Sequence, residues 1–302
     1  MTPLFPSSVE PLDICVPYWG DPDVFRLTID SVRDQTDPAW RLTIIDDGYP
    51  GTAIEDYVAS LADDRIRYRR NPTNVGITEN FRRAIAAGDG THVVVLGADD
   101  LLLPGYVAHV REMIAQHQDV DVIQPGVRVI DAAGHESSSL VDGVKQRLLT
   151  PHGGTLLQGE EFARSILVGN WLYWPSLVFR RAGLAGVDFR DGLPIILDLA
   201  FLVDIAMKDG ILLYTGVECF AYRRHGESLS QTTLQDGSRF ADERRFYREV
   251  AGRSAARGWR RAARAAHLRV MSRLHALTYL PRVLFTGSSA ARASTLKLAF
   301  GS

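Results

Sequence analysis

Short apolar runs alternate with amphipathic segments along the first hundred residues. The runs have the length of strands, whereas the segments between them place apolar residues three or four positions apart, as at Phe25, Ile29 and Val32. Asp21 precedes Pro22 and can cap the first helix. The expected order is strand 12–18, helix from 22, strand 42–45, helix 53–61, strand 66–69, helix 79–87 and strand 92–96. This alternation predicts a mostly parallel sheet with helices on both faces, a doubly wound α/β fold.

The alternation weakens after Pro104, and the rest of the chain predicts a mixture of elements. A polar, glycine-bearing stretch at 131–154 indicates a long loop, which in a compact domain is often functional or mobile. From Phe240 the chain is rich in Ala and Arg, which favours helices. The other expected elements are a helix at 105–116, a strand at 120–124 with a hairpin through Val129, a helix at 159–167, a strand at 172–179, a helix at 197–208 and short strands at 211–214 and 219–222.

The composition is that of an ordinary globular protein. The 302 residues are 46% hydrophobic and 23% charged, which excludes a disordered chain and a membrane-spanning one. The nearly apolar stretch 166–179 is too short to cross a bilayer. The first residues lack the basic and apolar regions of a secretory signal, so we expect a cytoplasmic location. Cys15 and Cys219 lie in apolar runs and are expected to be buried free thiols.

Charge is unevenly distributed along the chain. Between Arg244 and Lys297 stand 13 Lys and Arg residues against one acid, Glu249, whereas the remainder has more acids than bases. This basic segment could attract an anionic partner such as a phosphorylated lipid, which would place the protein peripherally at the inner membrane face. It could equally be a solvated helical face that neutralises the acidic body, or a homodimer contact. The sequence leaves these alternatives open.

Polar residues gather where the first four expected strands end. The carboxyl ends of parallel strands meet at one edge of a sheet, and ligands bind there. Asp, Asn and Gly also suit turns for backbone reasons, so one such pair has little weight, but two Asp pairs after apolar strands have more. The residues at this edge are Pro17 and Tyr18, Asp46 and Asp47, Arg70 and Asn71, and Asp99 and Asp100.

Five motifs follow one another in a recognisable order. They are a Val-Pro-Tyr turn at 16–18, an Asp-Asp-Gly-Tyr run at 46–49, an Asn-x-Gly-x-x-x-Asn element at 74–80, a Leu-x-x-Asp-Asp run at 96–100 with a later Pro104, and an acid, Asp198, before a Tyr-Arg-x-His-x-x-Ser-x-Ser run at 222–230. Over roughly residues 12–230 the chain therefore resembles the family 2 glycosyltransferases of the GT-A fold. Each motif alone is weak evidence, whereas five in the family's order are strong.

The resemblance implies a fold, an activity and a division of the chain. The doubly wound sheet would form a nucleotide-sugar-binding half at 1–103, a smaller acceptor-side sheet would lie in an acceptor-binding half at 104–235, and a basic helical extension would follow at 236–302. The implied activity is transfer of a hexosyl or related sugar from a nucleotide-diphosphate donor to a hydroxyl acceptor, with inversion and with help from Mg²⁺ or Mn²⁺. The acceptor could be a saccharide, a natural product or a lipid-linked compound, and nucleic acid is not an expected partner.

The resemblance also assigns the donor site. Tyr18 would stack on the base, and Asp46 would contact the base or the ribose. Asp47 is expected to brace its loop, and Gly and Asn residues of the 74–80 element are expected to be structural. Arg70 could neutralise a phosphate, or it could be a solvated strand end. The full set of implied donor-site residues is Pro17, Tyr18, Asp46, Asp47, Arg70, Asn74, Asp99 and Asp100.

Asp99, with Asp100 beside it, is the implied metal ligand. His225 could add a ligand or contact the diphosphate, or it could be a loop histidine with a structural hydrogen bond. The pair of acids could instead cap the turn before the next helix. Gly97 stands where the family usually has the first Asp of its Asp-x-Asp motif, so one potential carboxylate is missing.

Asp198 is the implied general base that takes the proton of the acceptor hydroxyl. It could instead cap the helix that runs to residue 208. Asp191 and Asp204 are weaker candidates for the same role. The aromatic residues at 171–174, Trp171, Tyr173 and Trp174, could form a sugar platform, although core packing would also account for them.

Gly97 keeps a second function open. A chain that had lost a metal-binding carboxylate could be a catalytically impaired nucleotide-sugar-binding protein that acts as a partner or regulator. A dinucleotide-dependent oxidoreductase is excluded, because no Gly-x-Gly-x-x-Gly follows the first strand.

Overall fold

The computed structural model describes residues 10–137, 143, 145–193, 196–224, 238–274, 277, 280 and 296. Its strands are β1 (Leu12–Tyr18), β2 (Trp40–Asp46), β3 (Ile66–Arg70), β4 (His92–Val95), β5 (Leu101–Leu102), β6 (Val122–Ile130), β7 (Thr155–Gln158), β8 (Val178–Arg180) and β9 (Ile211–Arg223). Its α-helices are α1 (Pro22–Arg33), α2 (Ala53–Leu61), α3 (Ile77–Ala86), α4 (Tyr106–Gln116), α6 (Gly159–Val168), α7 (Leu197–Ala206), α9 (Ser238–Ala256) and α10 (Arg260–Leu268). Short helical turns occupy Lys145–Leu149, Trp174–Ser176 and Arg181–Leu184.

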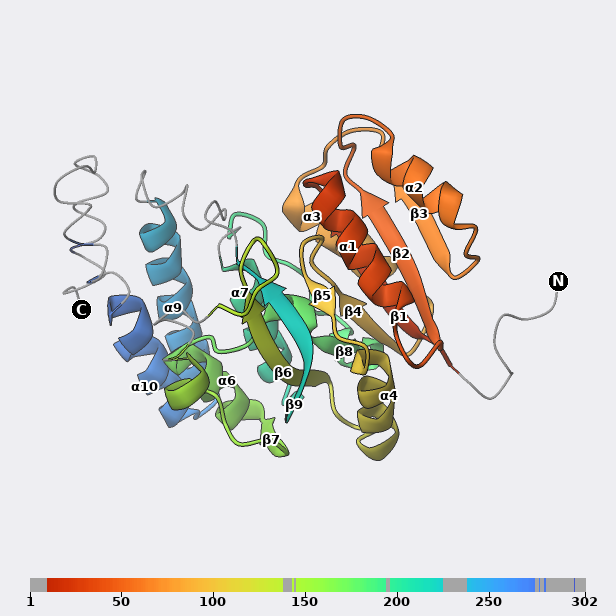
Figure 1. Ribbon diagram of the computed structural model, residues 1–302. Coiled ribbons are helices and arrows are strands. Elements are labelled where there is room, and N and C mark those ends of the chain that lie inside the picture. The colour runs from red at the N-terminus through yellow and green to blue at the C-terminus, as the bar shows by residue number, and fades with distance from the viewer. Residues whose placement is uncertain are drawn as a thin grey trace.

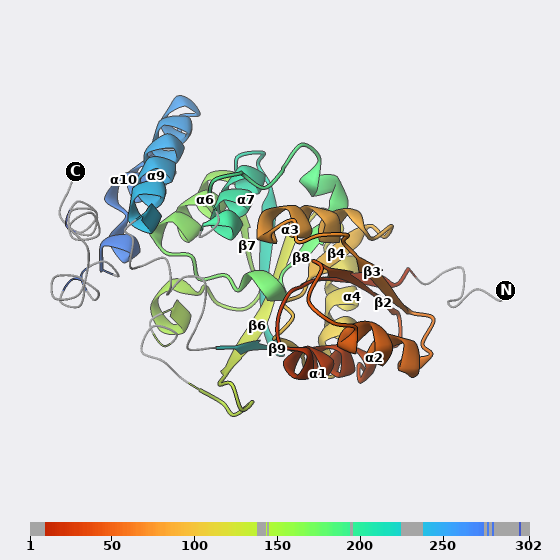
Figure 2. The ribbon, with the colours of Figure 1, turned by 90° about the horizontal axis from the view of Figure 1, so that it is seen from above.

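The strands join into one mixed sheet with helices on both faces. Within the described residues its order is β3-β2-β1-β4-β8-β6-β9-β5, and β7 pairs with the outer side of β9 (Figure 1). The first four strands are parallel, as the sequence predicted. Figure 2 shows α1 and α2 on one side of the sheet and α3, α6 and α7 on the other. The predicted doubly wound α/β fold is therefore confirmed.

Alternation along the strands divides the core in two. In β1 the side chains of Ile14 and Val16 join the apolar cluster under α1 and α4, whereas Cys15 joins the cluster under α3, α6 and α7. Such a two-sided apolar strand is expected in a sheet covered on both faces. Cys15 and Cys219 are buried free thiols, as predicted, and burial raises the pKa of both to about 12.

The second half differs from the sequence prediction in three places. The hairpin through Val129 was wrong, because β6 continues straight through Pro125 and absorbs it in a bulge opposite β9. The strand predicted at 172–179 is mostly absent, since Pro175 has no amide hydrogen for a sheet bond and starts a helical turn instead. The two short strands predicted at 211–222 are one strand, bent at Gly216, whose φ is 74°.

The strands of the second half belong to the same sheet as the strands of the first half. β8 lies between β4 and β6 and pairs antiparallel with both, so the second half continues the first without a break. β5 and β7 were not predicted, because Leu101–Leu102 and Thr155–Gln158 lack both the apolar run of a buried strand and a clear alternation. The antiparallel pairing of β5 with β9 brings the loop after β4 to the carboxyl end of β9.

The C-terminal helices pack firmly on the body. In the ribbon α10 lies beside α6 (Figure 1). Phe246, Tyr247 and Val250 of α9 and Ala262 of α10 are buried in the same apolar cluster as residues of α6 and α7. Their arginines also pair with acids of the body, which confirms for these residues that the basic segment neutralises the acidic body. The pairs are Arg253–Asp204 at 2.8 Å, Arg257–Asp209 at 2.7 Å and Arg261–Glu161 at 2.8 Å.

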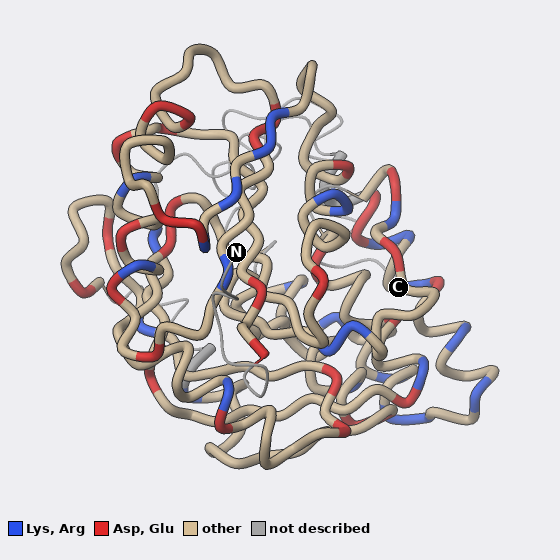
Figure 3. Tube along the Cα trace, turned by 90° about the vertical axis from the view of Figure 1, so that its right-hand side faces the viewer, with Lys and Arg blue, Asp and Glu red and all other residues tan. Residues whose placement is uncertain are grey.

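Charges of both signs are interspersed over the opposite end of the molecule, which carries the first strands. Figure 3 shows segments of both signs there, and β3 carries Arg67, Arg69 and Arg70 without an acid between them. Among the helices within the described ranges, none is long and apolar enough to cross a membrane.

Candidate active site

The carboxyl ends of β1 and β2 meet at one edge of the sheet. Pro17 and Tyr18, the last residues of β1, stand opposite Ile45 and Asp46 in the parallel register. β4 pairs with the other side of β1 in the same direction, so the loop that carries Asp99 leaves from this edge too. The predicted convergence of polar residues at one edge is therefore present.

Both carboxylate oxygens of Asp46 accept hydrogen bonds from residues around the loop that follows β2. The residue is 2% exposed; Oδ1 accepts the amide of Tyr49 at 2.7 Å, and Oδ2 accepts the hydroxyl of Tyr68. These two bonds fix the turn after β2 to β3. A contact from Asp46 to a base or ribose stays a prediction.

Asp47 braces the neighbouring loop, as predicted. Its Oδ1 accepts Nδ2 of Asn71 and the amide of Val75, both at 2.9 Å, and its Oδ2 accepts the amide of Gly76 at 3.0 Å. Gly76 has a φ of 84°, which favours glycine, and Asn80 ties α3 to this loop by accepting from Asn71 at 3.0 Å. The structural roles predicted for Gly76 and Asn80 are confirmed.

The aromatic residue that faces outward at the end of β1 is Trp19. Tyr18 is 1% exposed, because its ring stacks on Phe25 with centroids 4.4 Å apart and its hydroxyl donates to the Gly20 carbonyl at 3.0 Å. These contacts cover the ring of Tyr18 in the absence of a ligand, and its stacking on a base stays a prediction. Trp19 is 51% exposed and meets Tyr49 edge-on at 5.3 Å. Strand alternation could have revealed this, since residue 18 shares the buried parity of 14 and 16.

Arg70 and Asn74 shape the loops beside this edge. The two terminal nitrogens of Arg70 donate to the carbonyls of Gly51 at 2.7 Å and Tyr49 at 2.6 Å, and the side chain lies at the surface. Oδ1 of Asn74 accepts the amide of Gly76 at 3.0 Å. The predicted contacts of Arg70 and Asn74 to a nucleotide are not tested by these bonds and stay predictions.

The carboxylates of Asp99 and Asp100 both turn toward Gly97. A Cβ on Gly97 would collide with Oδ2 of Asp100 and lie 3.0 Å from Oδ1 of Asp99. Asp100 is 1% exposed; Oδ1 accepts the Arg223 amide at 2.8 Å, whereas Oδ2 is buried and has no hydrogen bond within the described residues. Burial, and next the charge of Asp99, raise the pKa of Asp100 well above its usual range. The pair concentrates negative charge beside a residue that has no side chain.

This pair of acids fits a divalent cation. Mg²⁺ and Mn²⁺ prefer oxygen ligands and are commonly held by one or two carboxylates together with substrate phosphates. Among the residues that the structure describes, no donor reaches the buried Oδ2 of Asp100. No cluster of three or more His, Cys, Asp or Glu occurs in the part of the chain that the structure describes. His225, the other predicted ligand, lies outside the described residues.

Arg223 fastens the Asp99 loop, a role that the sequence did not reveal. The residue is 3% exposed, its Nε donates to the carbonyl of Asp99 at 2.8 Å, and its Nη1 donates to the carbonyls of Asp131 at 3.2 Å and Ala132 at 3.0 Å. Together with its amide bond to Asp100, Arg223 links the loop after β4, the end of β6 and the end of β9. Its place directly after Tyr222 in the late motif was the available signal.

Asp198 lies in the first turn of α7, but it does not cap that helix. The N-cap position belongs to Ile196, so the alternative role as a cap is wrong. Nδ2 of Asn170 donates to Oδ2 of Asp198 at 3.0 Å. This bond helps to fix the orientation of the carboxylate.

Tyr222 brings the candidate metal ligands and the candidate base into one region. Burial raises the pKa of Tyr222 to about 12, and the charges of Asp100, Asp99 and Asp198 contribute to this rise in that order. All three carboxylates therefore lie within electrostatic reach of one phenol group, although they come from segments about a hundred residues apart. The motifs predicted a gathering of distant acids, and the roles of these three acids in one site stay predictions.

The rival candidates for the base are engaged in ion pairs. Asp191 is highly exposed and meets Nη2 of Arg82 at 3.0 Å. Asp204 accepts two bonds from Arg190, at 2.6 and 2.8 Å, and a third contact from Arg253 at 2.8 Å. Neither acid is among those that raise the pKa of Tyr222.

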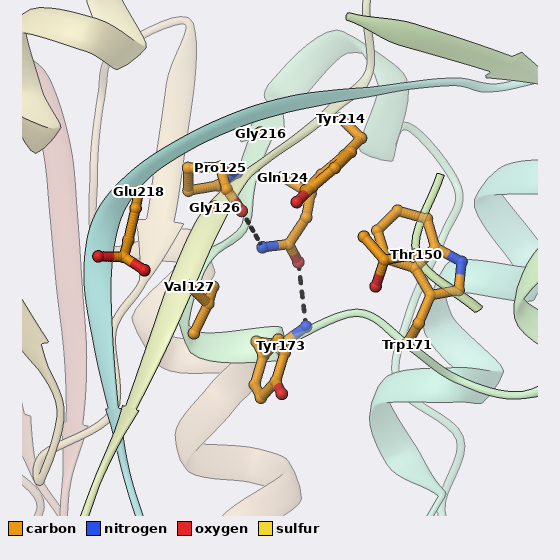
Figure 4. Close-up of a pocket in the computed structure, with 10 residues that line it drawn as sticks. All are labelled: Gln124, Pro125, Gly126, Val127, Thr150, Trp171, Tyr173, Tyr214, Gly216 and Glu218. Atoms are coloured by element: carbon orange, nitrogen blue, oxygen red, sulfur yellow. Dashed lines mark hydrogen bonds between the residues drawn. The ribbon is translucent and has the colours of Figure 1, made fainter. Parts of the chain in front are cut away.

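A cavity of about 230 Å³ opens next to this region, between β6, β9 and the segment after α6 (Figure 4). Trp171 and Tyr173 line it, whereas Trp174 packs in the core against Phe179 and Phe201. Gln124 also lines the cavity and fixes the backbone of Tyr173, because its Oε1 accepts the Tyr173 amide at 3.0 Å (Figure 4). The ring of Tyr173 lies 5.2 Å from that of Tyr222, so the cavity borders the acidic region.

Comparison with known proteins decides the family. The family model described as glycosyl transferase family 2 matches residues 13–160. These residues form a family 2 glycosyl transferase domain. The domain contains both Asp pairs of the site, Asp46–Asp47 and Asp99–Asp100, and continues through β6.

Curated relatives and solved structures agree with this glycosyl transferase domain. A putative glycosyltransferase, EpsE of Bacillus subtilis, is 23% identical over 143 residues, which cover 47% of this chain and 49% of EpsE. The chain thus spans about half the length of that relative. The structure of S. aureus TarS 1–349 in complex with UDP-GlcNAc is 14% identical with a TM-score of 0.64, covering 96% of this chain and 89% of that one.

A third comparison supports the same fold. The mannosyltransferase PcManGT of Pyrobaculum calidifontis, solved in complex with GDP-Man and Mn²⁺, is 14% identical with a TM-score of 0.55, covering 96% of this chain and 81% of that one. At such identities the likeness concerns the fold, which is of the GT-A type.

Proposed function

We propose that the protein is an inverting glycosyltransferase that moves a sugar from a nucleoside-diphosphate donor to a hydroxyl acceptor. The proposal is supported most by the three carboxylates around Tyr222, two at the donor edge and one on α7. The family 2 domain at residues 13–160 and the nucleotide-sugar complexes of TarS and PcManGT support the donor class.

In the proposed reaction Asp198 is the general base. It accepts the proton of the acceptor hydroxyl while that oxygen bonds to the anomeric carbon of the sugar. The bond from that carbon to the diphosphate oxygen breaks, and its electron pair leaves with the nucleoside diphosphate. A single displacement from the opposite side inverts the anomeric centre. Asn170 orients the base through its 3.0 Å bond to Oδ2.

Asp99 and Asp100 would hold Mg²⁺ or Mn²⁺ beside the leaving diphosphate. Such an ion supplies charge that stabilises the departing diphosphate. Arg223 contributes by fixing the loop from both sides, through Asp100 and through the carbonyl of Asp99. The aromatic cavity beside Tyr173 suits the acceptor, because sugars and apolar aglycones pack on aromatic faces.

The deciding experiment compares Asp198→Asn with Asp191→Asn in donor-binding and transfer assays. Each substitution removes one carboxylate, but Asp191 is 82% exposed in its side chain and lies outside the proposed site. We expect Asp198→Asn to lower turnover by about 10²-fold or more, the usual worth of a general base, with donor binding retained. Asp191→Asn should behave like the parent. Near-normal turnover in Asp198→Asn would refute the base assignment.

The same assays test the second candidate function, a nucleotide-sugar-binding protein without transferase activity. Gly97 favours this alternative, because a family carboxylate is missing there. Donor binding without transfer or donor hydrolysis, across a panel of donors and acceptors with Mn²⁺, would support it. Turnover of any donor would exclude it.

A further inference from the structure

Exposed apolar side chains gather after the end of α10. Leu268 is the last residue of that helix, Arg269 turns the chain with a φ of 48°, and helical residues begin again at Val270. Val270 and Leu274 lie four positions apart and share a helix face. Leu268, Val270 and Leu274 are 41%, 42% and 49% exposed, and Leu277, three positions further on, is exposed too. This part of the chain therefore presents an apolar face at the surface.

The turn Lys145–Leu149 lies beside this face. A Cβ on Gly169 would lie 2.7 Å from both Cδ1 of Leu149 and Cγ of Met271, so both of these side chains lie against that glycine. Leu148 precedes Leu149 and is 73% exposed, the highest value among the large apolar residues that the structure describes. Two segments that are far apart in the sequence therefore bring exposed apolar side chains into one region of the surface.

Arginines without acidic partners border these apolar residues. Arg260, Arg264 and Leu268 recur every four positions on α10, so they share one face of the helix, and both arginines are exposed. Arg147, in the neighbouring turn, is exposed too. No acid pairs with Arg147, Arg260 or Arg264 among the residues that the structure describes. The sequence has no Asp or Glu after Glu249, so α10 and the residues that follow it add only positive charge.

This combination fits a lipid membrane with anionic headgroups. Exposed leucines and valines gain free energy when they enter the boundary between headgroups and acyl chains, whereas arginines stay among the headgroups and attract anionic lipids. The aliphatic stem of an arginine also lies along apolar surface while its charged end remains in water. A second copy of this chain fits less well, because a two-fold contact would set one basic patch against another.

We propose that the protein binds peripherally to the surface of an anionic membrane. The binding surface combines the exposed apolar residues after α10 with the arginines of that helix and with the neighbouring turn. Its central residues are Arg147, Leu148, Arg260, Arg264, Val270 and Leu274. Membrane binding goes beyond the proposed glycosyltransferase function and does not depend on it.

Co-sedimentation of the full chain with vesicles tests this proposal. The vesicles consist of phosphatidylcholine alone or of phosphatidylcholine mixed with phosphatidylglycerol, which is anionic. We expect the parent to bind the mixed vesicles at least about tenfold more tightly than phosphatidylcholine vesicles, because each arginine near the surface adds attraction to anionic lipids. High salt should weaken this preference, since attraction between surface charges is screened.

Two double variants separate the apolar part of the binding from its charged part. Leu148→Ser/Leu274→Ser should reduce binding to the mixed vesicles by about tenfold or more, because less apolar surface enters the bilayer. Arg260→Gln/Arg264→Gln should also reduce binding to the mixed vesicles, and it should make the remaining binding less sensitive to salt.

Matched controls lie on the half of the molecule that is far from α10, on α1 and β3 (Figures 1 and 2). Leu27 on α1 is 53% exposed, and Arg67 and Arg69 on β3 are exposed as well. Leu27→Ser and Arg67→Gln/Arg69→Gln should therefore bind vesicles like the parent.

The proposal is overturned if the parent binds neither kind of vesicle, or if Leu148→Ser/Leu274→Ser binds the mixed vesicles like the parent. An equal loss of binding in the controls would overturn it as well. Should the leucine variant fail to fold, Arg260→Gln/Arg264→Gln decides, and parental binding with parental salt dependence would overturn the proposal. A parent that binds no vesicles and forms dimers in analytical ultracentrifugation, which the leucine substitutions dissociate, would assign this surface to a second copy. Normal turnover in Asp198→Asn would leave vesicle binding intact, so the two proposals fail separately.

Discussion

Oδ2 of Asp100 occupies the space that a side chain on Gly97 would need. The acid is held there by the bond from the Arg223 amide to its other oxygen, at 2.8 Å. The absence of a side chain at position 97 is therefore what allows the Asp100 carboxylate to turn inward. In this chain an oxygen from Asp100 stands close to where a residue 97 side chain would begin.

Restoring the family's acid at position 97 should therefore harm the protein. Gly97→Asp forces Asp100 to move and adds a third carboxylate beside two others, which we expect to cost about 1–3 kcal/mol of unfolding free energy. Gly97→Ala separates the steric part from the charge. Urea denaturation measures both variants, and parental stability in Gly97→Asp would show that Asp100 rotates freely.

Asp99→Asn should weaken the response to Mn²⁺. A ligand that binds only the folded state raises its stability, by about 2.7 kcal/mol at a hundred times its dissociation constant. We expect thermal scans with Mn²⁺ and a nucleoside diphosphate to show an upward shift in the parent and little or none in Asp99→Asn. Asp188→Asn is the control, since Asp188 is exposed and pairs with Arg82 at 2.9 Å. An equal rise in melting temperature in Asp99→Asn would remove Asp99 from the metal site.

Substitution of Trp19 should affect donor binding, whereas substitution of Tyr18 should affect the stability of the fold. Base stacking on an aromatic residue is worth about 1–3 kcal/mol, so Trp19→Ala should weaken donor binding by roughly one order of magnitude and change stability little. Tyr18→Ala removes a buried ring that stacks on Phe25 and should cost about 3–5 kcal/mol of stability. Calorimetry of donor binding and urea denaturation distinguish them. Unaltered donor affinity in Trp19→Ala would argue against a stacking role.

His92 should make the fold sensitive to acid. Burial lowers the pKa of His92 below its usual value near 6.5, partly opposed by Glu10, so the unfolded chain takes up a proton before the folded one does. The contribution of neutral His92 to stability is then fully present above about pH 6.5. It is lost as the pH falls from there through the lowered pKa of the folded state, because protonation favours the unfolded chain over that range.

His92→Gln should flatten this dependence when unfolding free energies at pH 7.5 and pH 5.5 are compared. His135→Gln, at a side chain that is 82% exposed, should leave the dependence unchanged. An identical pH dependence in His92→Gln and the parent would contradict the assignment.

The sequence predicted the parallel half well because each of its strands and helices has its own periodic pattern. The turn after β2 and the brace by Asp47 could be foreseen, since Gly and Asn at fixed spacing have few other uses. The second half was harder. β8 and β9 pair with strands that lie far away in the sequence, and local patterns do not reveal such pairings. Pro125 and Gly216 suit turns, but here they lie within strands, at irregular positions of the pairing.

Side-chain direction limited the prediction of the site. Motif order placed Tyr18, Asp46 and Asp100 at the correct edge, but it could not show that all three turn inward. Arg223 and Asn170 escaped notice because each acts through bonds to residues far away in the sequence. Such long-range partners follow from the fold and leave no periodic trace.

The arginine that secures the Asp99–Asp100 loop lies 63 positions beyond residue 160, where the family match ends. A fragment of residues 1–160 would keep every acid of that edge and still lose the bonds from Arg223. The second half of the chain thus holds the Asp99–Asp100 loop in place, so a change made at the end of β9 is expected to be felt at the carboxyl end of β4.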